Sequence, residues 1–422
     1  MIKGEKIRFD IHKILYSIYK FNKTLNSASI KKIINKHDKK DISFLNNVTL
    51  NSMRFHLHSS KIISKYIKKK LRDKEKILLI SAITQIVFLD FKEYAVVNCS
   101  VEIAKKLNMH HGLINAALKN ISENKEHLKK INIQFDELPE WFKNKTISLT
   151  DNEKKNFIKN FYKEPSLHIV FKSEEKLKEF EEDLIETSEI SGFLKNKKDL
   201  KTIVSFRKGD WWVQDFSSFF PLFSLQVKKS SKKFLDACAA PGGKAFQILS
   251  HNNQIILNDK SKKRIKILEE NLNRLNFKSK ISNQDFIKFN NGQKFDFIII
   301  DAPCSSIGTI RKNPEIFFKN KGPSFKNLET IQENLLKKAS VLLNNKGYIL
   351  YMTCSFLEVE TINQINMFLK KNSDFELFNF KLNKKFIKYS KFIKEGLMIT
   401  FPDKILEYNI DGYFAACIKK IK

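Results

Sequence analysis

The stretch "KKFLDACAAPGGKAFQILS", residues 232–250, joins an apolar strand, a loop of small residues and a helix. In a doubly wound parallel sheet, ligands bind beyond the carboxyl ends of the strands, and glycines there let the backbone approach them closely. The loop with Gly242 and Gly243 is neither a G-x-G-x-x-G dinucleotide pattern nor a P-loop, because Ala245 follows Lys244 where a P-loop has Ser or Thr. The stretch therefore predicts a nucleoside ligand without a polyphosphate.

The alternation of strand and helix continues from residue 226 to the C-terminus. It predicts an α/β Rossmann-like core with a mostly parallel sheet and helices on both faces, and "GYFAACIKK" at 412–420 adds an antiparallel strand. The expected parallel strands are "KKFLDA" (232–237), "QIILND" (254–259), "SKISNQ" (279–284), "KFDFIIID" (294–301) and "KGYILYMT" (346–353), and 327–345 is an expected helix.

The chain before this core has two different patterns. Residues 1–128 show apolar residues at helical spacing and predict an all-α domain, followed by a linker at 129–145. Residues 146–225 predict a small α+β unit, and 226–422 form the expected catalytic domain. Within the small unit we expect strands at 166–171, 201–206 and 209–217 and a helix at 174–188.

Aspartates follow the successive strands of the core. Asp259 ends the second strand, where a carboxylate accepts hydrogen bonds from ribose hydroxyls. Asp285 follows the third strand, where it can meet an adenine edge, and Asp301 ends the fourth. Each aspartate alone is more often a cap or turn residue, but a polar end on four successive strands favours a ligand site.

Two of the five cysteines, Cys304 and Cys354, follow two apolar strands that should be neighbours. Cytosine C5 is a weak nucleophile, and adding a thiolate at C6 activates it, after which a base must remove the C5 proton. The reaction therefore needs two protein groups near one cytosine ring. Asp301 can bind the amino or N3 edge of that cytosine. A thiol needs a nearby cation or dipole to ionise, and Lys244 and Arg311 are candidates.

Composition narrows the partners and the compartment. The formal charge of +31 favours a polyanionic partner such as nucleic acid, although a Lys-rich composition alone also raises charge. The odd cysteine count without a C-x-x-C pair favours neither disulfides nor a zinc site, so we expect a reducing cytoplasm and no metal. The run "ILLISAITQIVFLDF" (77–91) contains polar residues and predicts a buried helix, not a membrane span.

Three motifs together resemble the RNA cytosine-5 methyltransferases, in particular the bacterial Sun/Fmu (RsmB) family that modifies small-subunit 16S ribosomal RNA. They are "DACAAPGGK" (236–244), "DAPCSSIGTIRKNPEI" (301–316) and "YMTCS" (351–355). The resemblance extends to "GDWWVQDFSSFFPL" (209–222) and "DGYFAACIKK" (411–420), and the N-terminal domain resembles a NusB-like RNA-binding module in "YAVVNCSVEIAKKL" (94–107) and "GLINAALKNI" (112–121).

The resemblance implies a cofactor and roles for individual residues. The cofactor would be S-adenosylmethionine, Cys354 the nucleophile that attacks C6, and Cys304 the group that assists proton removal or product release. An RNA-recognition-like subdomain would precede the catalytic core. The implied cofactor site comprises Cys238, Ala239, Ala240, Pro241, Gly242, Gly243 and Lys244, completed by Asp259, Asp285 and Asp301.

Two other functions remain open. A DNA cytosine-5 methyltransferase would use Cys304, in its Pro-Cys pair, as the nucleophile, but the second cysteine and the NusB-like domain favour RNA. A catalytically inactive RNA-binding or ribosome-assembly protein is the other alternative, and the intact cysteines, glycines and aspartates argue against it. We expect a monomer with RNA as its partner and without membrane attachment.

Overall fold

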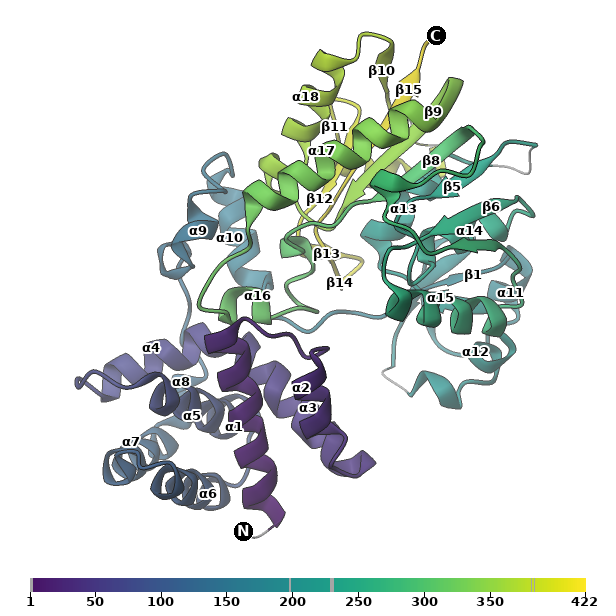
Figure 1. Cartoon of the computed structure of the whole chain (residues 1–422). Helices are drawn as coiled ribbons and strands as arrows, with labels where there is room; N and C mark the ends of the chain where they lie inside the picture. The colour runs from purple at the N-terminus through teal and green to yellow at the C-terminus, as the bar shows by residue number, and fades with distance from the viewer. Residues whose placement is uncertain (1–2, 197–198, 228–230, 381, 383) are drawn as a thin grey trace. The chain divides into compact units, whose positions relative to one another are not determined.

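The computed structural model describes residues 3–196, 199–227, 231–380, 382 and 384–422 (Figure 1). The chain divides into two compact units. One comprises Met1–Tyr162 and Ile310–Pro323, and the other comprises Lys163–Thr309 and Ser324–Lys422.

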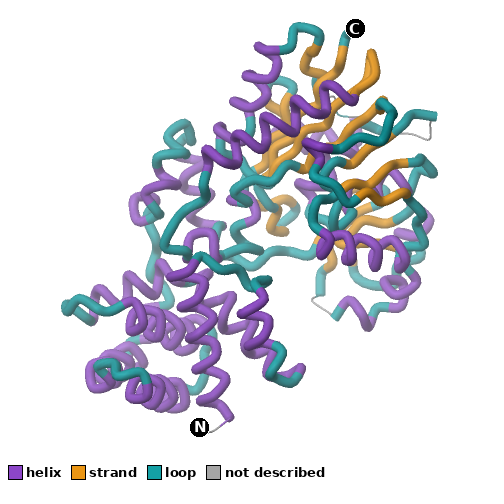
Figure 2. Tube along the Cα trace, in the orientation of Figure 1, coloured by secondary structure: helices purple, strands orange, loops and turns teal. Residues whose placement is uncertain are grey.

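The first unit is built of helices (Figure 2), and those before residue 129 share one apolar core, as the helical spacing over 1–128 predicts. The run 77–91 is a buried helix that ends in a π-helical turn, and over the described residues no helix is long and apolar enough to cross a membrane. The elements are α1 (Lys3–Phe21), α2 (Ala28–Ile34), α3 (Lys39–Arg54), α4 (His56–Tyr66), α5 (Asp73–Ile83), η1 (Thr84–Phe88), α6 (Glu93–Lys106), α7 (His111–Glu123), α8 (Lys125–Leu128), η2 (Phe135–Glu137), α9 (Glu140–Lys143), α10 (Asp151–Asn160) and α16 (Glu315–Phe318).

The segment Ile310–Pro323 belongs to this helical unit although it follows the Cys304 motif directly. Phe317 of α16 packs edge-on against Phe142, with ring centroids 5.1 Å apart, and Phe318 packs against Tyr19 at 5.8 Å. The predicted boundaries place this segment in the catalytic domain, because a linear pattern does not reveal that its aromatic side chains are buried among helices much earlier in the chain.

A four-stranded antiparallel sheet with the order β2-β3-β1-β4 opens the second unit. Two local predictions here are wrong, and the expected strand 209–217 is shorter, because only Trp211–Val213 pairs with β1 and Phe216 begins a helix. The expected helix 174–188 ends at Lys178, because Leu184–Ser188 pairs with β3. The expected strand 201–206 is helical instead. It spans the end of a 3-10 turn and the start of α12, which Gly209 caps at φ +76°. The elements are β1 (His168–Phe171), α11 (Glu174–Lys178), β2 (Leu184–Ser188), β3 (Ser191–Leu194), η3 (Leu200–Thr202), α12 (Val204–Lys208) and β4 (Trp211–Val213).

The larger sheet confirms the predicted Rossmann-like core. Its order is β11-β12-β15-β9-β8-β5-β6-β7; β5 to β9 run parallel, and β15 is antiparallel to β9. Its strands are β5 (Phe234–Asp236), β6 (Ile255–Asn258), β7 (Lys280–Ser282), β8 (Phe295–Asp301), β9 (Leu343–Thr353), β10 (Phe375–Phe378), β11 (Ile393–Lys394), β12 (Leu397–Thr400) and β15 (Tyr413–Lys420), with β13 (Asp403–Ile405) and β14 (Tyr408–Ile410) as a separate ribbon.

Helices cover both faces of this sheet. On β8, Phe297 and Ile299 join the core formed with α13, α14 and α15, whereas Ile298 and Ile300 join the core formed with α17 and α18, because successive strand side chains point to opposite faces. The helices and turns are α13 (Phe216–Ser224), α14 (Gly243–Leu249), α15 (Lys262–Arg274), η4 (Phe286–Lys288), η5 (Ile307–Thr309), α17 (Phe325–Leu342), η6 (Glu358–Glu360), α18 (Ile362–Lys371) and η7 (Lys384–Phe392).

The strand order reverses at β5, which lies between β6 and β8. Such a switch point leaves a crevice beyond the carboxyl ends of the strands, where ligands bind in doubly wound sheets. The loop at 237–242 leaves β5, and the loop of Cys304 leaves the neighbouring strand β8. The fold therefore brings both sequence motifs to one edge of one sheet.

Candidate active site

The loop between β5 and α14 requires a glycine at one position. Gly242 has φ +118°, and a Cβ atom there would lie 2.0 Å from Cζ of Phe246. Asn271 of α15 supports the preceding residue, because its side-chain amide donates to the carbonyl oxygen of Pro241 at 3.1 Å. The loop is therefore fixed both by its backbone conformation and by a neighbouring helix.

A Gly242→Ala substitution is expected to lower the free energy of unfolding by about 1–3 kcal/mol, because a side chain at this φ is strained and would clash with the Phe246 ring. Thermal unfolding measures the loss. Gly292→Ala is the matched control, since Gly292 has φ +74° but no heavy atom within 4 Å of the added Cβ. Equal losses in the two variants would contradict a role for the Phe246 contact.

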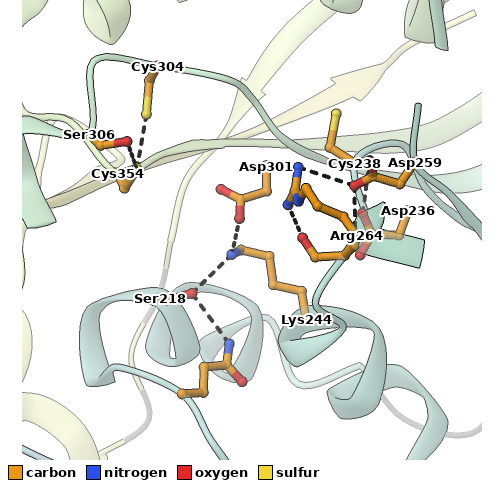
Figure 3. Close-up of polar contacts among 12 residues, drawn as sticks. Ser218, Asp236, Cys238, Lys244, Asp259, Arg264, Asp301, Cys304, Ser306 and Cys354 are labelled. Atoms are coloured by element: carbon orange, nitrogen blue, oxygen red, sulfur yellow. Dashed lines mark hydrogen bonds and ion pairs between the residues drawn. The ribbon is translucent and has the colours of Figure 1, made fainter. Parts of the chain in front are cut away.

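Asp259, at the end of β6, is buried and holds the loop. Its carboxylate accepts from the backbone N–H of Ala240 at 3.3 Å and of Ser261 at 2.9 Å, and it forms an ion pair with Arg264 at 3.2 Å (Figure 3). Arg264 also donates to the Ala240 carbonyl oxygen. Sequence reasoning missed Arg264, although its position one turn into the helix after Asp259 is a usable signal.

Burial raises the pKa of two further side chains under the loop. Burial raises the pKa of Asp236 to about 7, and its carboxyl group accepts from the backbone N–H of Cys238 at 3.3 Å. Burial and the nearby carboxylates, first that of Asp236, raise the pKa of the Cys238 thiol far above its ordinary value. Cys238 is therefore a protonated thiol of the loop and unsuited to act as a nucleophile.

A cavity of about 240 Å³ lies beyond the ends of β5, β6 and β7. Polar groups of Asn258, Asp259 and Asp285 line it together with the apolar side chains of Phe286 and Ile287. Carboxylates suit ribose hydroxyls and amino groups, and apolar surfaces suit the faces of a base. The residues present therefore fit the nucleoside part of S-adenosylmethionine.

Lys244 connects the loop to β8. Its ammonium group, buried from solvent, donates to Oδ2 of Asp301 at 2.7 Å and to Oγ of Ser218 at 3.0 Å. Ser218 lies on α13 and also accepts from the side-chain amide of Gln214 at 3.5 Å, as Figure 3 shows. Sequence reasoning missed Ser218, because a single serine in a Phe-rich helix carries no distinctive pattern.

The two cysteines meet at the ends of β8 and β9, which are parallel neighbours. Sγ of Cys304 lies 3.1 Å from Sγ of Cys354, and the Cys354 thiol is also 3.4 Å from Oγ of Ser306 (Figure 3). The hydrogen bond to Cys354 and burial raise the pKa of Cys304 well above its ordinary value. The Cys304 thiol therefore faces Cys354 directly.

The two cations proposed to help a thiol ionise have different surroundings. Lys244 is paired with Asp301 in the second unit. Arg311 is fully buried in the helical unit, where its Nε donates to the carbonyl oxygen of Asn160 at 2.9 Å. Its guanidinium is thus a structural hydrogen-bond donor of that unit, a role that the sequence position beside the Cys304 motif did not indicate.

The fold is that of a class I methyltransferase core, and the lining of its cavity fits the nucleoside of S-adenosylmethionine. Residues 223–419 match the family model "16S rRNA methyltransferase RsmB/F", and residues 6–123 match the NusB family. Over these two ranges, the first of which is slightly less than half of the chain, the protein is similar to the RsmB/F 16S rRNA methyltransferases and to the NusB family.

Individual relatives agree with this assignment. The chain is 32% identical to ribosomal RNA small subunit methyltransferase B of Shewanella oneidensis over 53% of its own length and 51% of that protein, so this match spans about half of the relative. It is 26% identical to the protein of the same name from Vibrio vulnificus over 79% of the chain and 83% of that protein.

Two solved structures share the fold. The crystal structure of PH0851 matches with a TM-score of 0.72 at 20% identity, over 100% of this chain and 99% of that chain. NSun6 from Pyrococcus horikoshii matches with a TM-score of 0.54 at 18% identity, over 66% of this chain and 97% of that chain. At these identities the likeness supports the architecture alone.

Proposed function

We propose that this protein transfers a methyl group from S-adenosylmethionine to C5 of a cytosine in 16S ribosomal RNA through a covalent cysteine–C6 bond. The observation that carries the proposal is the 3.1 Å contact between the sulfur atoms of Cys304 and Cys354. Two thiols within reach of one base meet the requirement for both an attacking group and a second group that assists its release.

Cys354 is the proposed nucleophile. Its thiolate attacks C6 and forms a carbon–sulfur bond, which makes C5 electron-rich; when bound, S-adenosylmethionine supplies the methyl group that C5 accepts. The C5 proton must then leave to a base while the carbon–sulfur bond breaks and the Cys354 thiolate returns. Cys304 assists these last events, because its thiol already shares a hydrogen bond with the sulfur that departs.

The remaining site residues bind and orient. Asp259 and Asp285 hold the nucleoside of the cofactor in the cavity that Cys238 also lines, and the loop residues up to Lys244 complete its site. Asp301 receives the amino or N3 edge of the cytosine, and Lys244 fixes the direction of that carboxylate through their 2.7 Å hydrogen bond. A target base in a stacked region must first be turned out, since C6 is inaccessible within the stack.

The charge of the chain supports an RNA partner. A formal charge of +31 favours contacts with phosphates, and the NusB family match covers most of the N-terminal helices. We infer that the protein acts on RNA as a monomer in the cytoplasm, a reducing compartment in which its five free cysteines remain thiols.

Adduct trapping tests the proposal. Cys304→Ala, incubated with a 16S rRNA transcript and S-adenosylmethionine, is expected to accumulate a covalent protein–RNA complex on a denaturing gel, because the carbon–sulfur bond forms but is released slowly. The double variant Cys304→Ala with Cys354→Ser should form none. If Cys354→Ser accumulates the complex instead, Cys304 is the nucleophile and the roles proposed here are reversed.

A further inference from the structure

A buried carboxylate holds the turn that carries Cys304. Glu360 lies in η6, shortly after Cys354, and is fully buried. Oε1 accepts from the backbone N–H of Ser305 at 2.7 Å, and Oε2 accepts from the Ser305 hydroxyl at 2.5 Å. Both carboxylate oxygens are thus used on the residue that follows Cys304.

Gln332 of α17 extends this contact to the other side of Cys304. Its side-chain amide donates to the carbonyl oxygen of Pro303 at 2.9 Å and to Oε1 of Glu360 at 3.4 Å. The backbone of Glu360 is itself fixed, because its carbonyl oxygen accepts from the Tyr351 hydroxyl at 2.9 Å. The residues on both sides of Cys304 are therefore tied to one carboxylate.

The turn needs such support because its backbone is strained. Ser306 has φ +60°, a conformation that residues with a side chain seldom adopt and keep only where surrounding contacts impose it. Among the described residues, no lysine or arginine forms an ion pair with Glu360. Burying a carboxyl group away from any cation is costly, which favours a functional reason for a glutamate at this place.

We propose that Glu360 is a positioning residue that holds the Pro303–Ser306 turn so that the Cys304 thiol stays against Cys354 and releases the methylated product. This inference rests on the proposed function and deepens it. It assigns to Glu360 no contact with substrate; the residue acts through Ser305. After the hydrogen bond to Cys354 and burial, the nearby Glu360 is a further cause that raises the pKa of Cys304.

The test compares adduct formation with adduct release in Glu360→Gln and Ser305→Ala. Both variants weaken the hydrogen bonds between Glu360 and Ser305, here called the clamp, and leave Cys354 unchanged. With a 16S rRNA transcript and S-adenosylmethionine, we expect the first methyl transfer to proceed and release to slow by roughly 10- to 100-fold, the scale at which misplacing a reacting group acts. The covalent complex should then accumulate on a denaturing gel, and kcat should fall while KM for RNA stays constant.

Glu358→Gln is the matched control, because Glu358 lies in the same short helix and is exposed, and it should behave as the unaltered protein. If formation and release fall together in Glu360→Gln and Ser305→Ala, or if neither changes, the inference is overturned. If Glu360→Gln does not fold, the result for Ser305→Ala decides. Cys304→Ala on the same gel separates the two proposals. If Cys304→Ala forms no covalent complex, the proposed function fails. If Cys304→Ala forms the complex but Glu360→Gln and Ser305→Ala do not, only the role of Glu360 is overturned.

Discussion

Replacing Cys354 with serine is expected to reduce methyl transfer to 16S rRNA by roughly 10⁴-fold or more, the scale on which enzymes lose activity when their nucleophile is removed. A thiol ionises with a pKa of about 8.5, whereas a serine hydroxyl does not ionise near neutral pH. The serine keeps the hydrogen-bonding capacity of the position but cannot form the bond to C6.

Initial rates of methyl incorporation into a 16S rRNA transcript measure this loss. Cys99→Ser is the matched control, because Cys99 lies in the helical unit and has no place in the proposed chemistry. Thermal unfolding and binding of S-adenosylmethionine should be unchanged in Cys354→Ser. Substantial activity in this variant, together with an inactive Cys304→Ser, would transfer the nucleophile to Cys304 and favour the arrangement of DNA cytosine-5 enzymes.

Replacing Lys244 with methionine is expected to lower kcat/KM by roughly 10²- to 10³-fold, as loss of one preorganised polar contact does in other active sites. Methionine retains the apolar length of the side chain but removes the ammonium that donates to Asp301 and Ser218. The half-buried Asp301 carboxylate then loses both its partner and its fixed direction.

Steady-state methyl transfer and cofactor binding, measured together, show where the loss arises. Lys266→Met is the control, because Lys266 is exposed on α15 and removes the same charge from the chain. We expect Lys244→Met to lose far more in transfer than in affinity for S-adenosylmethionine. Equal activity of the two variants would contradict the role of the Lys244–Asp301 pair.

The strands of the catalytic core were predictable because each is a short apolar run that ends at a polar residue or a loop. The helix predicted at 174–188 failed for the opposite reason. Its first turn has charges suited to a helix, but Leu184–Ser188 contains the β-branched residues Ile185 and Thr187 and is fixed as a strand by pairing with Ser191–Leu194. A short segment with both tendencies takes the structure that its neighbours impose.

The predicted site residues lie at the ends of strands of the parallel sheet or in the segments that directly follow them. Residues outside that pattern were missed. Ser218 comes from a Phe-rich helix, Arg264 from the first turn of the helix that follows Asp259, and Glu360 from a short helix that follows Cys354. Their contacts with the site residues depend on how the helices pack, and no local spacing encodes that.

The sequence by itself determined the class of protein, since three motifs at strand ends specify a nucleoside loop and two cysteines, and periodicity specifies a helical domain before them. Only the tertiary structure decided which polar groups meet. It joined Lys244 to Asp301 and tied Ser305 to Glu360, and it set the 3.1 Å contact between Cys304 and Cys354, whose strands the sequence already predicted to be neighbours. These pairings follow from the order and direction of strands, because residues distant in the chain become neighbours only when the sheet forms.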